Sequence, residues 1–473
     1  MPIDTAHADY TKMLPKWERC SDAADGQDAV HAAGPKYLPK LTDQSDADYA
    51  AYKQRACFYN ATWRTISGLL GMILRVPPVV SVPDTYMPLL DDVDLAGTDI
   101  TTFINHVLEE SLETGRSGVL VDSPQLAESV ATRADAALNG ARPMMQMYDA
   151  EAIINWRTGS IQNRQQLTLV VLKEEAAVQK DEWETGSETR WRELALVDGV
   201  YRVRVFRRSA GNPQAFEQIG DDIWPTVAGQ RINYIPFVFI GVDELTPEVD
   251  DPPLIDLVDL NLAHYRVTAD YEHGCHFTGL PTAIITGYTK ATPDEKLYVG
   301  STSAMIFPDP ATSASFLEFS GQGLSTLVEN LNRKEQQMAI LGARRLEPQR
   351  KSVEAADTAS IHRKGEESLL ATIAQTVGRG VERALGWMIE WAGGAHAEVA
   401  VELNRDFYPV PMTGQTLTAI MGAWQAGMPG FSDQEVFAKL QRGGMISGGT
   451  TLEEEQARIL NRQIELSNIN LGA

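Results

Sequence analysis

The chain has 473 residues, and its formal charge of −23 arises from 64 acidic and 41 basic side chains. At about 150 residues per domain, this length predicts roughly three domains. A hydrophobic fraction of 43% and a charged fraction of 22% exclude a disordered protein. The acidic excess argues against a protein that grips nucleic acid over its whole surface, because such binders present a basic face. Two interpretations of the acidity stay open: a solvated surface, or a surface that DNA passes without being held.

Cysteine usage and hydropathy indicate the compartment. Cys20, Cys57 and Cys275 are widely spaced, which predicts a reducing compartment rather than a disulfide framework. The opening MPIDTAHADY lacks the basic and apolar regions of a signal peptide. The longest apolar runs, such as YIPFVFIGV, are about half as long as a membrane helix. We therefore expect a protein made in the cytosol, without a membrane partner.

Residues 1 to about 120 have a mainly helical pattern. Apolar side chains recur at helical spacing in DYAAYKQRACFYNATWRTISGLLGMIL, namely Tyr52, Ala56, Tyr59, Trp63, Ile66 and Leu70. The prolines of RVPPVV end this run. A second helix is predicted over TDITTFINHVLEESLETG, capped by Thr98 or Asp99 and stopped at Gly115. SGVLVD then predicts a buried strand.

From about residue 143 to 242 the pattern changes to strands. LTLVVLKEE, RWRELALVDG, VYRVRVFRRS and YIPFVFIGV are rich in β-branched and aromatic residues, and Gly, Asp and Pro separate them. The Asp-Gly pair within LVDGVYRVRV predicts a tight hairpin turn between two of these strands.

Helices return after residue 250. DDPPLIDLVDLNLAHYRVTADYEHG predicts a helix capped by Asp251 and apolar on more than one side, as in a helix packed between neighbours within the chain or across subunits. Short strands are predicted over 280–319, followed by a helix over GLSTLVENLNRKEQQMAILGARR that Pro348 ends. A helix of roughly 35 residues comes next, with a bend expected at its glycines. Three shorter helices complete the chain.

A basic segment, LGARRLEPQRKSVEAADTA, separates the two long helical patterns of the C-terminal half. Arg344, Arg345, Arg350 and Lys351 lie within it, opposed only by Glu347. Cations at the C-terminus of a helix interact favourably with its dipole, which accounts for Arg344 and Arg345. The dipole does not account for Arg350 and Lys351, which follow Pro348. A contact with nucleic acid is the alternative interpretation.

The sequence offers no catalytic motif. A glycine-rich phosphate loop followed by Lys and Ser or Thr is absent. GRSGVLVD resembles a serine nucleophile turn, but Gly118 follows Ser117 directly, so the required spacing fails. No carboxylate pair stands out among 64 acidic residues. We therefore expect neither an enzyme nor a cofactor.

Two clusters contain residue types that bind metal ions. His273, Cys275 and His276 lie together in YEHGCHF, but a closed zinc site needs four ligands and no second cluster exists. A site completed by another subunit stays open. The acidic LLDDVD, with Asp91, Asp92 and Asp94, lacks the glycine and terminal glutamate of a calcium loop and predicts a solvated turn. No metal site is therefore predicted.

Several of these segments together resemble the portal proteins of tailed bacteriophages, in the subgroup long known as a domain of unknown function. The likeness is carried by YAAYKQRACFYNATWRTISGLLGMILRVPP, TGRSGVLVDSP, YDAEAIINWR, INYIPFVFIGVDE and PPLIDLVDLNLAHYRVTADYEHGCHFTGLPTAIITG. These segments cover most of residues 45 to 290, and the later helix–loop–helix order fits portal topology.

The resemblance implies an α+β portal fold with seven successive parts. These are a wing of helices and strands (1–250), a first stem helix (251–279), a clip (280–319), a second stem helix (320–345), a tunnel loop (346–356), a long kinked wing helix (357–395) and a C-terminal wing and crown (396–473).

The resemblance further implies a homododecameric ring at one capsid vertex, through which double-stranded DNA is packaged and ejected. The expected partners are the terminase large subunit, a head–tail adaptor and the major capsid protein. The protein would reside in the virion, and in the host cytoplasm during assembly. The alternatives are another head–tail connector component, although those are generally far shorter, and a metal-dependent hydrolase built on the acidic residues.

In such a ring, twelve copies of Arg344, Arg345, Arg350 and Lys351 would meet at one constriction. The ring itself would carry twelve times −23, or about −276. Acidic walls repel phosphate, whereas a narrow basic collar makes transient contacts that weaken as salt rises. We therefore expect this collar to steady the duplex during packaging.

Overall fold

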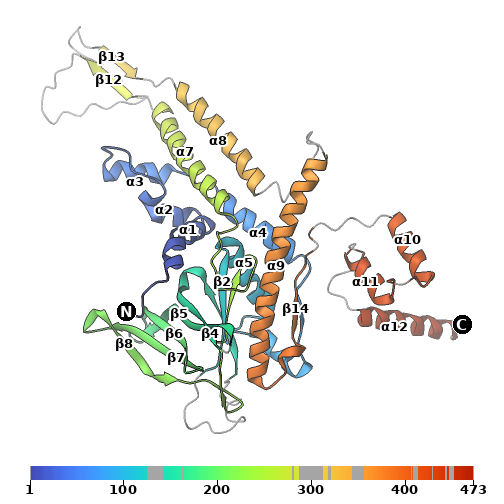
Figure 1. Cartoon of the computed structure of the whole chain (residues 1–473). Helices are drawn as coiled ribbons and strands as arrows, with labels where there is room; N and C mark the ends of the chain where they lie inside the picture. Colours follow the sequence, from blue (N-terminus) through green and yellow to red (C-terminus); the bar gives the residue numbers. More distant parts are fainter. Residues whose placement is uncertain are drawn as a thin grey trace. The chain divides into compact units, whose positions relative to one another are not determined.

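The computed structural model shows an α+β protein in which helices and antiparallel strands occupy separate stretches of the chain (Figure 1). It describes residues 2–124, 142–161, 163–279, 282–286, 313–317, 321–342, 356–405, 407, 414–428, 430–442, 445–446 and 452–471. The expected fold class is thereby confirmed. Within these residues no helix combines the length and the apolar character needed to cross a membrane.

The chain divides into two compact units, and each is described by itself. The first unit comprises residues 1–18, 66–253 and 351–473, and the second comprises residues 19–65 and 254–350. Each unit is therefore assembled from segments that are distant in the sequence.

Five helices confirm the helical pattern of the N-terminal region. They are α1 Ala8–Asp25, α2 Gln27–Ala33, α3 Asp46–Arg55, α4 Ala61–Ile73 and α5 Ile100–Glu113, with short 3₁₀ turns at Gly34–Lys36 and Asp84–Asp91. The long run predicted over α3 and α4 is, however, broken at residues 56–60. Asn60 begins α4 by accepting a hydrogen bond from the Trp63 backbone N–H at 2.8 Å. The single apolar stripe was wrong at this break, because Tyr59 and Trp63 are 47% and 39% exposed.

Among the residues that the structure describes, the first unit contains two sheets of three or more strands and two short strand pairs. The smaller has the order β11–β2–β3, built from Phe237–Gly241, Arg116–Asp122 and Met144–Asp149. The larger is a meander of β4 Ile153–Ile161, β5 Arg164–Gln179, β6 Thr185–Val197, β7 Val200–Ser209 and β8 Asn212–Ile223. Three short elements complete this region: a 3₁₀ turn at Ala150–Ala152 and the strand pair β9 Thr226–Val227 and β10 Gln230–Arg231. All strand pairs are antiparallel.

The core of the first unit lies between its sheets. Phe237 and Phe239 of β11 pack with Trp156, Val170 and Leu194 of the larger sheet. The alternate residues of β11 face the other way, where α5 and α9 cover the smaller sheet. The small sheet is thus a middle layer with helices on one face and the meander on the other (Figure 1).

The predicted Asp-Gly turn joins β6 to β7. Val197 pairs with Val200, so Asp198 and Gly199 form a two-residue loop. Both have positive φ, 51° and 78°, as a type I′ turn requires. This local prediction is confirmed.

The longest helix is α9, Ala356–Ala392, which runs without a break through its four glycines (Figure 1). Its glycines allow close packing. A Cβ at Gly380 would lie 2.6 Å from Ile240, and one at Gly386 would lie 2.5 Å from the His396 ring. Gly378 similarly faces the Val401 carbonyl of β14 Ala400–Glu402, which pairs with β1 Val79–Ser81 and follows a 3₁₀ turn at His396–Glu398.

The predicted start of the helix that follows residue 250 was wrong. α7 spans Ile255–Gly279, so Asp251 and the two prolines precede it rather than cap it. Asp251 instead accepts a hydrogen bond from Lys16 Nζ. The remaining elements are β12 Thr282–Thr286, β13 Ser313–Leu317, α8 Gln322–Leu341, α10 Gly414–Gln425, α11 Asp433–Arg442 and α12 Leu452–Leu471. The last three confirm the predicted C-terminal helices.

Candidate functional site

The predicted DNA-contacting residues Arg344, Arg345, Arg350 and Lys351 lie outside the described residues. The described residues stop at Gly342, before these four residues, and resume at Ala356, after them. α8 ends at Leu341, and Gly342 donates its backbone N–H to the Met338 carbonyl, while α9 begins at Ala356. The part of the candidate site that the structure describes therefore consists of the helices that lead into the basic segment.

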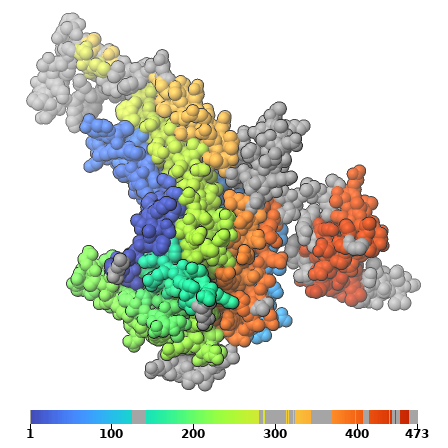
Figure 2. Space-filling view, viewed as in Figure 1, coloured from blue at the N-terminus to red at the C-terminus, as the bar shows by residue number. Residues whose placement is uncertain are grey.

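α7 and α8 lie side by side (Figure 2), and the contacts between them show that they run antiparallel. A Cβ at Gly274 would lie 2.7 Å from Leu324, and one at Gly342 would lie 3.0 Å from Leu257. Between these contacts, His264 lies 3.5 Å from Glu335. The contacts step along the two helices in opposite directions over 17 residues of α7, or about 26 Å. The pair thus has one end at β12–β13, which pair with each other, and the other end where the basic segment begins.

The two helices differ in how much of their surface is covered within the chain. α7 packs Val258, Leu262, Tyr265 and Ala269 against residues of α1 to α3 and of the connection between α3 and α4, including Tyr52 and Phe58. α8 has a single fully buried side chain among its described residues, Met338, while Val328 and Ile340 are exposed. The prediction that α7 is apolar on more than one side is confirmed. α8 leaves most of its outer face uncovered.

Asn261 of α7 organises the start of α4 from a distance of about 200 residues in the chain. Its Oδ1 accepts hydrogen bonds from the backbone N–H groups of Ala61 and Thr62, both at 3.1 Å, and from the Thr62 hydroxyl. Its Nδ2 donates to the Tyr59 carbonyl at 2.8 Å. Asn261 is fully buried and both polar atoms of its side chain form hydrogen bonds, so it serves as an N-terminal cap supplied by another helix.

His264 faces α8 within the second unit. It is 5% exposed, and its Nε2 lies 3.5 Å from a Glu335 carboxylate oxygen. Burial lowers the pKa of His264, against the opposing effect of Glu335. Burial thus favours the neutral form of the imidazole at this contact between α7 and α8.

The residues considered as metal ligands have other contacts. His276 Nε2 lies 3.2 Å from a guanidinium nitrogen of Arg55, and the His273 ring meets the edge of Tyr52 at 5.1 Å. Tyr52 in turn donates its hydroxyl proton to Asp270 at 2.6 Å. Among the described residues, no group of three or more His, Cys, Asp or Glu side chains is arranged to hold a metal ion.

The acidic LLDDVD segment forms a turn that is closed by its own carboxylates. Asp94 Oδ1 accepts the backbone N–H groups of Ala96 at 2.8 Å and Thr98 at 3.2 Å. Asp92 accepts the Gly97 N–H at 3.0 Å and forms an ion pair with Arg142 at 2.8 Å. These side chains stabilise the loop before α5.

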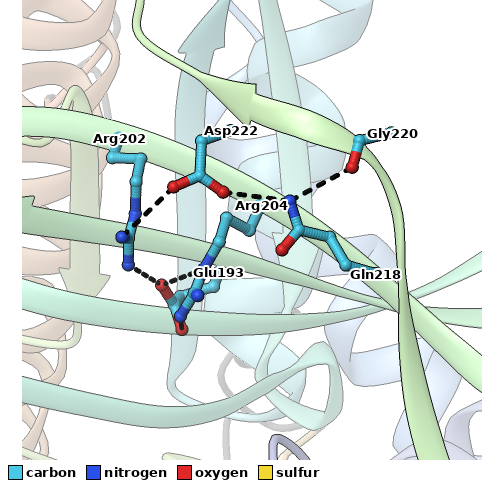
Figure 3. A network of polar contacts seen from close by, with 6 residues as sticks. All are labelled: Glu193, Arg202, Arg204, Gln218, Gly220 and Asp222. Atoms are coloured by element: carbon cyan, nitrogen blue, oxygen red, sulfur yellow. Dashed lines mark hydrogen bonds and ion pairs between the residues drawn. The ribbon is translucent and has the colours of Figure 1, made fainter.

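Most arginines of the larger sheet that the structure describes form ion pairs with carboxylates. Glu193, which is 8% exposed, accepts two bonds from Arg204, at 3.0 and 2.8 Å, and one from Arg202 at 2.9 Å (Figure 3). Arg202 also reaches Asp222 at 3.4 Å, and Asp222 accepts a bond from Gln218 (Figure 3). The sequence VYRVRVFRRS looks basic, yet each of its four arginines forms an ion pair with a carboxylate. Sequence reasoning missed this network, for which the alternation of Arg with Glu across neighbouring strands was the available signal.

A second charged network lies between the two sheets of the first unit. Arg192 donates to Asp122 at 2.6 Å and to Glu174 at 2.7 Å, and Tyr148 donates its hydroxyl to Glu174 at 2.5 Å. Burial works to lower the pKa of Arg192, but Tyr148, Glu174 and Asp122 outweigh burial and raise it. The guanidinium is therefore firmly charged, as charge-assisted bonds to two carboxylates require.

Arg116, the first residue of β2, is buried without a carboxylate in contact. Its guanidinium lies 4.3 Å from the Trp156 ring and 4.5 Å from the Phe239 ring. One Nη donates to the carbonyls of Pro247 and Glu248, both at 3.0 Å. Burial lowers the pKa of Arg116 to about 9, which keeps it charged at neutral pH. Arg116 thereby holds the segment that leads towards α7.

Glu110 lies in the last turn of α5, close to the connection from α5 to β2. Its Oε1 accepts bonds from the Thr114 hydroxyl at 2.8 Å and the Ala150 N–H at 3.1 Å. Burial, together with the nearby Asp149 and Glu113, raises the pKa of Glu110 to about 8. Glu110 is therefore largely protonated at neutral pH.

Comparisons with known proteins match part of this arrangement. Residues 253–392, from the start of α7 to the end of α9, match a family model described as "Domain of unknown function (DUF4055)". No curated protein matches the chain.

Solved structures similar to the chain include three from gene transfer agent (GTA) particles. "Virion of native gene transfer agent (GTA) particle" has 13% identity and a TM-score of 0.37, covering 89% of this chain and 98% of the other. "Neck of empty GTA particle computed with C6 symmetry" has 12% identity and a TM-score of 0.37, covering 89% and 99%. "Neck of native GTA particle computed with C12 symmetry" has 13% identity and a TM-score of 0.35, covering 88% and 98%. Similarities this weak carry no argument about function.

Proposed function

We propose that this chain is the subunit of a phage portal, a ring at one capsid vertex through which double-stranded DNA is packaged and later ejected. The observation that carries the proposal is the antiparallel α7–α8 pair. It separates the β12–β13 end from the start of the basic segment by about 26 Å. This arrangement supports the order stem helix, clip and stem helix that the sequence resemblance implies.

The uneven covering of α7 and α8 supports a ring of copies. α7 is packed within its own unit, whereas α8 leaves Val328 and Ile340 exposed. Apolar side chains on the outer face of a long helix favour a neighbouring molecule. In a ring, each α8 would meet the adjacent copy on one side and the channel on another.

The charge distribution supports passage of DNA rather than tight binding. The chain has a formal charge of −23, and the sheet arginines Arg192, Arg202 and Arg204 are engaged by carboxylates. The basic segment with Arg344, Arg345, Arg350 and Lys351 is then the natural place for transient phosphate contacts.

In this role the chain would not be an enzyme, because a separate terminase would supply the energy for packaging. Its partners would be copies of itself, the terminase large subunit at the β12–β13 end during packaging, a head–tail adaptor afterwards, and the major capsid protein. It would work in the virion, after assembly in the host cytoplasm.

Ring formation is the direct test. Native mass spectrometry of the purified protein should show assemblies near twelve times 52.0 kDa, or about 624 kDa, and negative-stain images should show rings with a central hole. A protein that stays monomeric or dimeric at all concentrations contradicts the proposal.

The basic segment gives a second test. Replacing Arg350→Ala and Lys351→Ala together should leave ring assembly unchanged but alter DNA packaging or retention in particles. A matched control replaces Arg458→Ala and Arg462→Ala, two exposed cations on α12. If the first pair leaves packaging and retention at the level of the control, the proposed role of the segment is wrong.

A further inference from the structure

The β5–β6 ribbon ends in a tryptophan that its own chain leaves in solvent. Trp183 is 89% exposed, the largest exposed fraction among the large hydrophobic residues that the structure describes. Exposed tryptophans of this kind are typical anchors of protein interfaces, because one rigid side chain supplies a large apolar area. The position of Trp183 at the end of a ribbon therefore indicates a contact with another molecule.

The turn that carries Trp183 is organised before any contact is made. Asp181 Oδ1 accepts the backbone N–H groups of Trp183 and Glu184, both at 2.8 Å. Lys180 donates its N–H to the Glu184 carbonyl at 2.9 Å, and its Nζ forms an ion pair with Glu184 at 2.6 Å. A turn held this way presents the indole with little entropy left to lose on binding.

The tip is acidic. Residues 179–188 contain Asp181, Glu182, Glu184 and Glu188 against the single cation Lys180. Lys180 pairs with Glu184, and Arg190 and Arg207 pair with Glu188, so among the described residues Asp181 and Glu182 are the acidic side chains of the tip without a cation. Such a tip repels nucleic acid and anionic lipid, and it favours a protein surface that carries unpaired arginine or lysine.

The other end of the same strand has the complementary charge. Residues 152–172 contain no Asp or Glu, and their only charged side chains are Arg157 and Arg164. Both are exposed, and neither forms an ion pair within the part of the chain that the structure describes. They lie on the β4–β5 hairpin, where Arg157 pairs with Leu169 and Arg164 with Ile161.

The acidic tip cannot reach this basic hairpin within one molecule. β5 runs from Arg164 to Gln179 in one strand, and its length at about 3.3 Å per residue is about 50 Å. The two complementary ends can therefore meet only between copies.

We propose that the Trp183 tip of one copy docks on the β4–β5 hairpin of a second copy. There Glu182 faces Arg157 and Arg164, and a guanidinium stacks on the indole. Tip and hairpin are different surfaces, so the contact is head-to-tail and can be repeated around a ring. The inference deepens the proposed function and rests on it, since it assigns one contact between neighbouring subunits.

Single variants test the tip. Trp183→Ala should raise the apparent dissociation constant between copies at least about tenfold, and Trp183→Phe should raise it less. Both are measured by analytical ultracentrifugation over a dilution series. Met428→Ala is a matched control, because Met428 is 56% exposed but lies outside the sheet, and it should leave assembly unchanged.

A mixing experiment tests the pairing of tip and hairpin. The tip variant carries Glu182→Arg with Trp183→Ala, and the hairpin variant carries Arg157→Ala with Arg164→Ala, so that the altered tip gains no new partner on the altered hairpin. Each alone should lose the ring. Their equimolar mixture should form dimers, because one intact tip and one intact hairpin remain, and mass spectrometry should find one molecule of each variant.

The outcomes distinguish a failure of the docking contact from a failure of the proposed ring. Rings that persist in both variants overturn the docking contact and leave the portal proposal standing. A mixture that forms no dimer likewise overturns the contact. A wild-type protein that is monomeric at all concentrations overturns both.

Discussion

Two arginines of the first unit have different hydrogen-bond partners, and their pKa values are shifted in opposite directions. Arg192 donates to two carboxylates, Asp122 and Glu174, and their charges raise its pKa despite burial. Arg116 donates to two backbone carbonyls between aromatic rings, and burial lowers its pKa to about 9. The comparison teaches that the partner, rather than the depth of burial, sets the direction of the shift and the consequence of removing the side chain.

The largest effect is expected from Arg192→Met. Removing the guanidinium leaves Asp122 and Glu174 buried without a cation, which should lower the free energy of unfolding by about 3–5 kcal/mol. Urea unfolding measures the loss. The control combines Arg192→Met with Asp122→Asn and Glu174→Gln, and it should recover much of the stability. Equal losses in both proteins would show that the ion pairs are not the cause.

Glu110 should make the stability of the α5–β2 corner depend on pH. Its pKa is raised to about 8 in the folded chain, so its contribution is full below the ordinary carboxyl pKa and is lost as pH rises through about 8. Between pH 5 and pH 9 the loss should be on the order of 2–4 kcal/mol. Glu110→Gln keeps the Oε1 acceptor and should flatten this dependence in urea unfolding. A variant with the same pH profile as the natural chain would contradict the assignment.

Asn261 extends the comparison to an uncharged group in the second unit. Asn261→Leu should cost about 2–3 kcal/mol, because the Ala61 and Thr62 N–H groups and the Tyr59 carbonyl lose their partner. Hydrogen exchange should rise first at the start of α4. Asn332→Leu, on the exposed side of α8, is the control and should change stability by less than about 0.5 kcal/mol. Equal effects of the two substitutions would rule out the capping role.

The smallest loss is expected from Arg116→Met, at about 1–2 kcal/mol in the same urea assay. The substitution leaves two carbonyls without a donor, but it also removes a charge that no carboxylate contacts. A loss as large as that of Arg192→Met would break the comparison and show that the aromatic pocket itself depends on the guanidinium.

Much of the secondary structure was predictable because its signals are local. Asp99 caps α5 by accepting the Thr101 N–H at 2.8 Å, and Gly115 ends the helix with a φ of 76°. The Asp198-Gly199 turn is equally local. The break between α3 and α4 was not predictable, because one of the groups that stabilise it, Asn261, lies 200 residues away.

The candidate site was only partly open to prediction. The order of the long helices α7, α8 and α9 follows from their apolar period, and the basic segment is visible as a run of residues. The antiparallel register of α7 and α8 needs contacts such as those of Gly274 with Leu324, which no local pattern contains.

The sequence by itself determined the positions of turns and helix ends, the α+β class and the overall acidity, since these depend on neighbouring residues or on composition. Tertiary structure alone decided which charges are cancelled and which stay free. Glu193 forms ion pairs with Arg202 and Arg204 because strand register places the three side chains side by side. Arg157 and Arg164, in contrast, form no ion pair with a carboxylate in the part of the chain that the structure describes. The physical reason is that Coulomb energy depends on distance in space, and only the folded chain sets that distance.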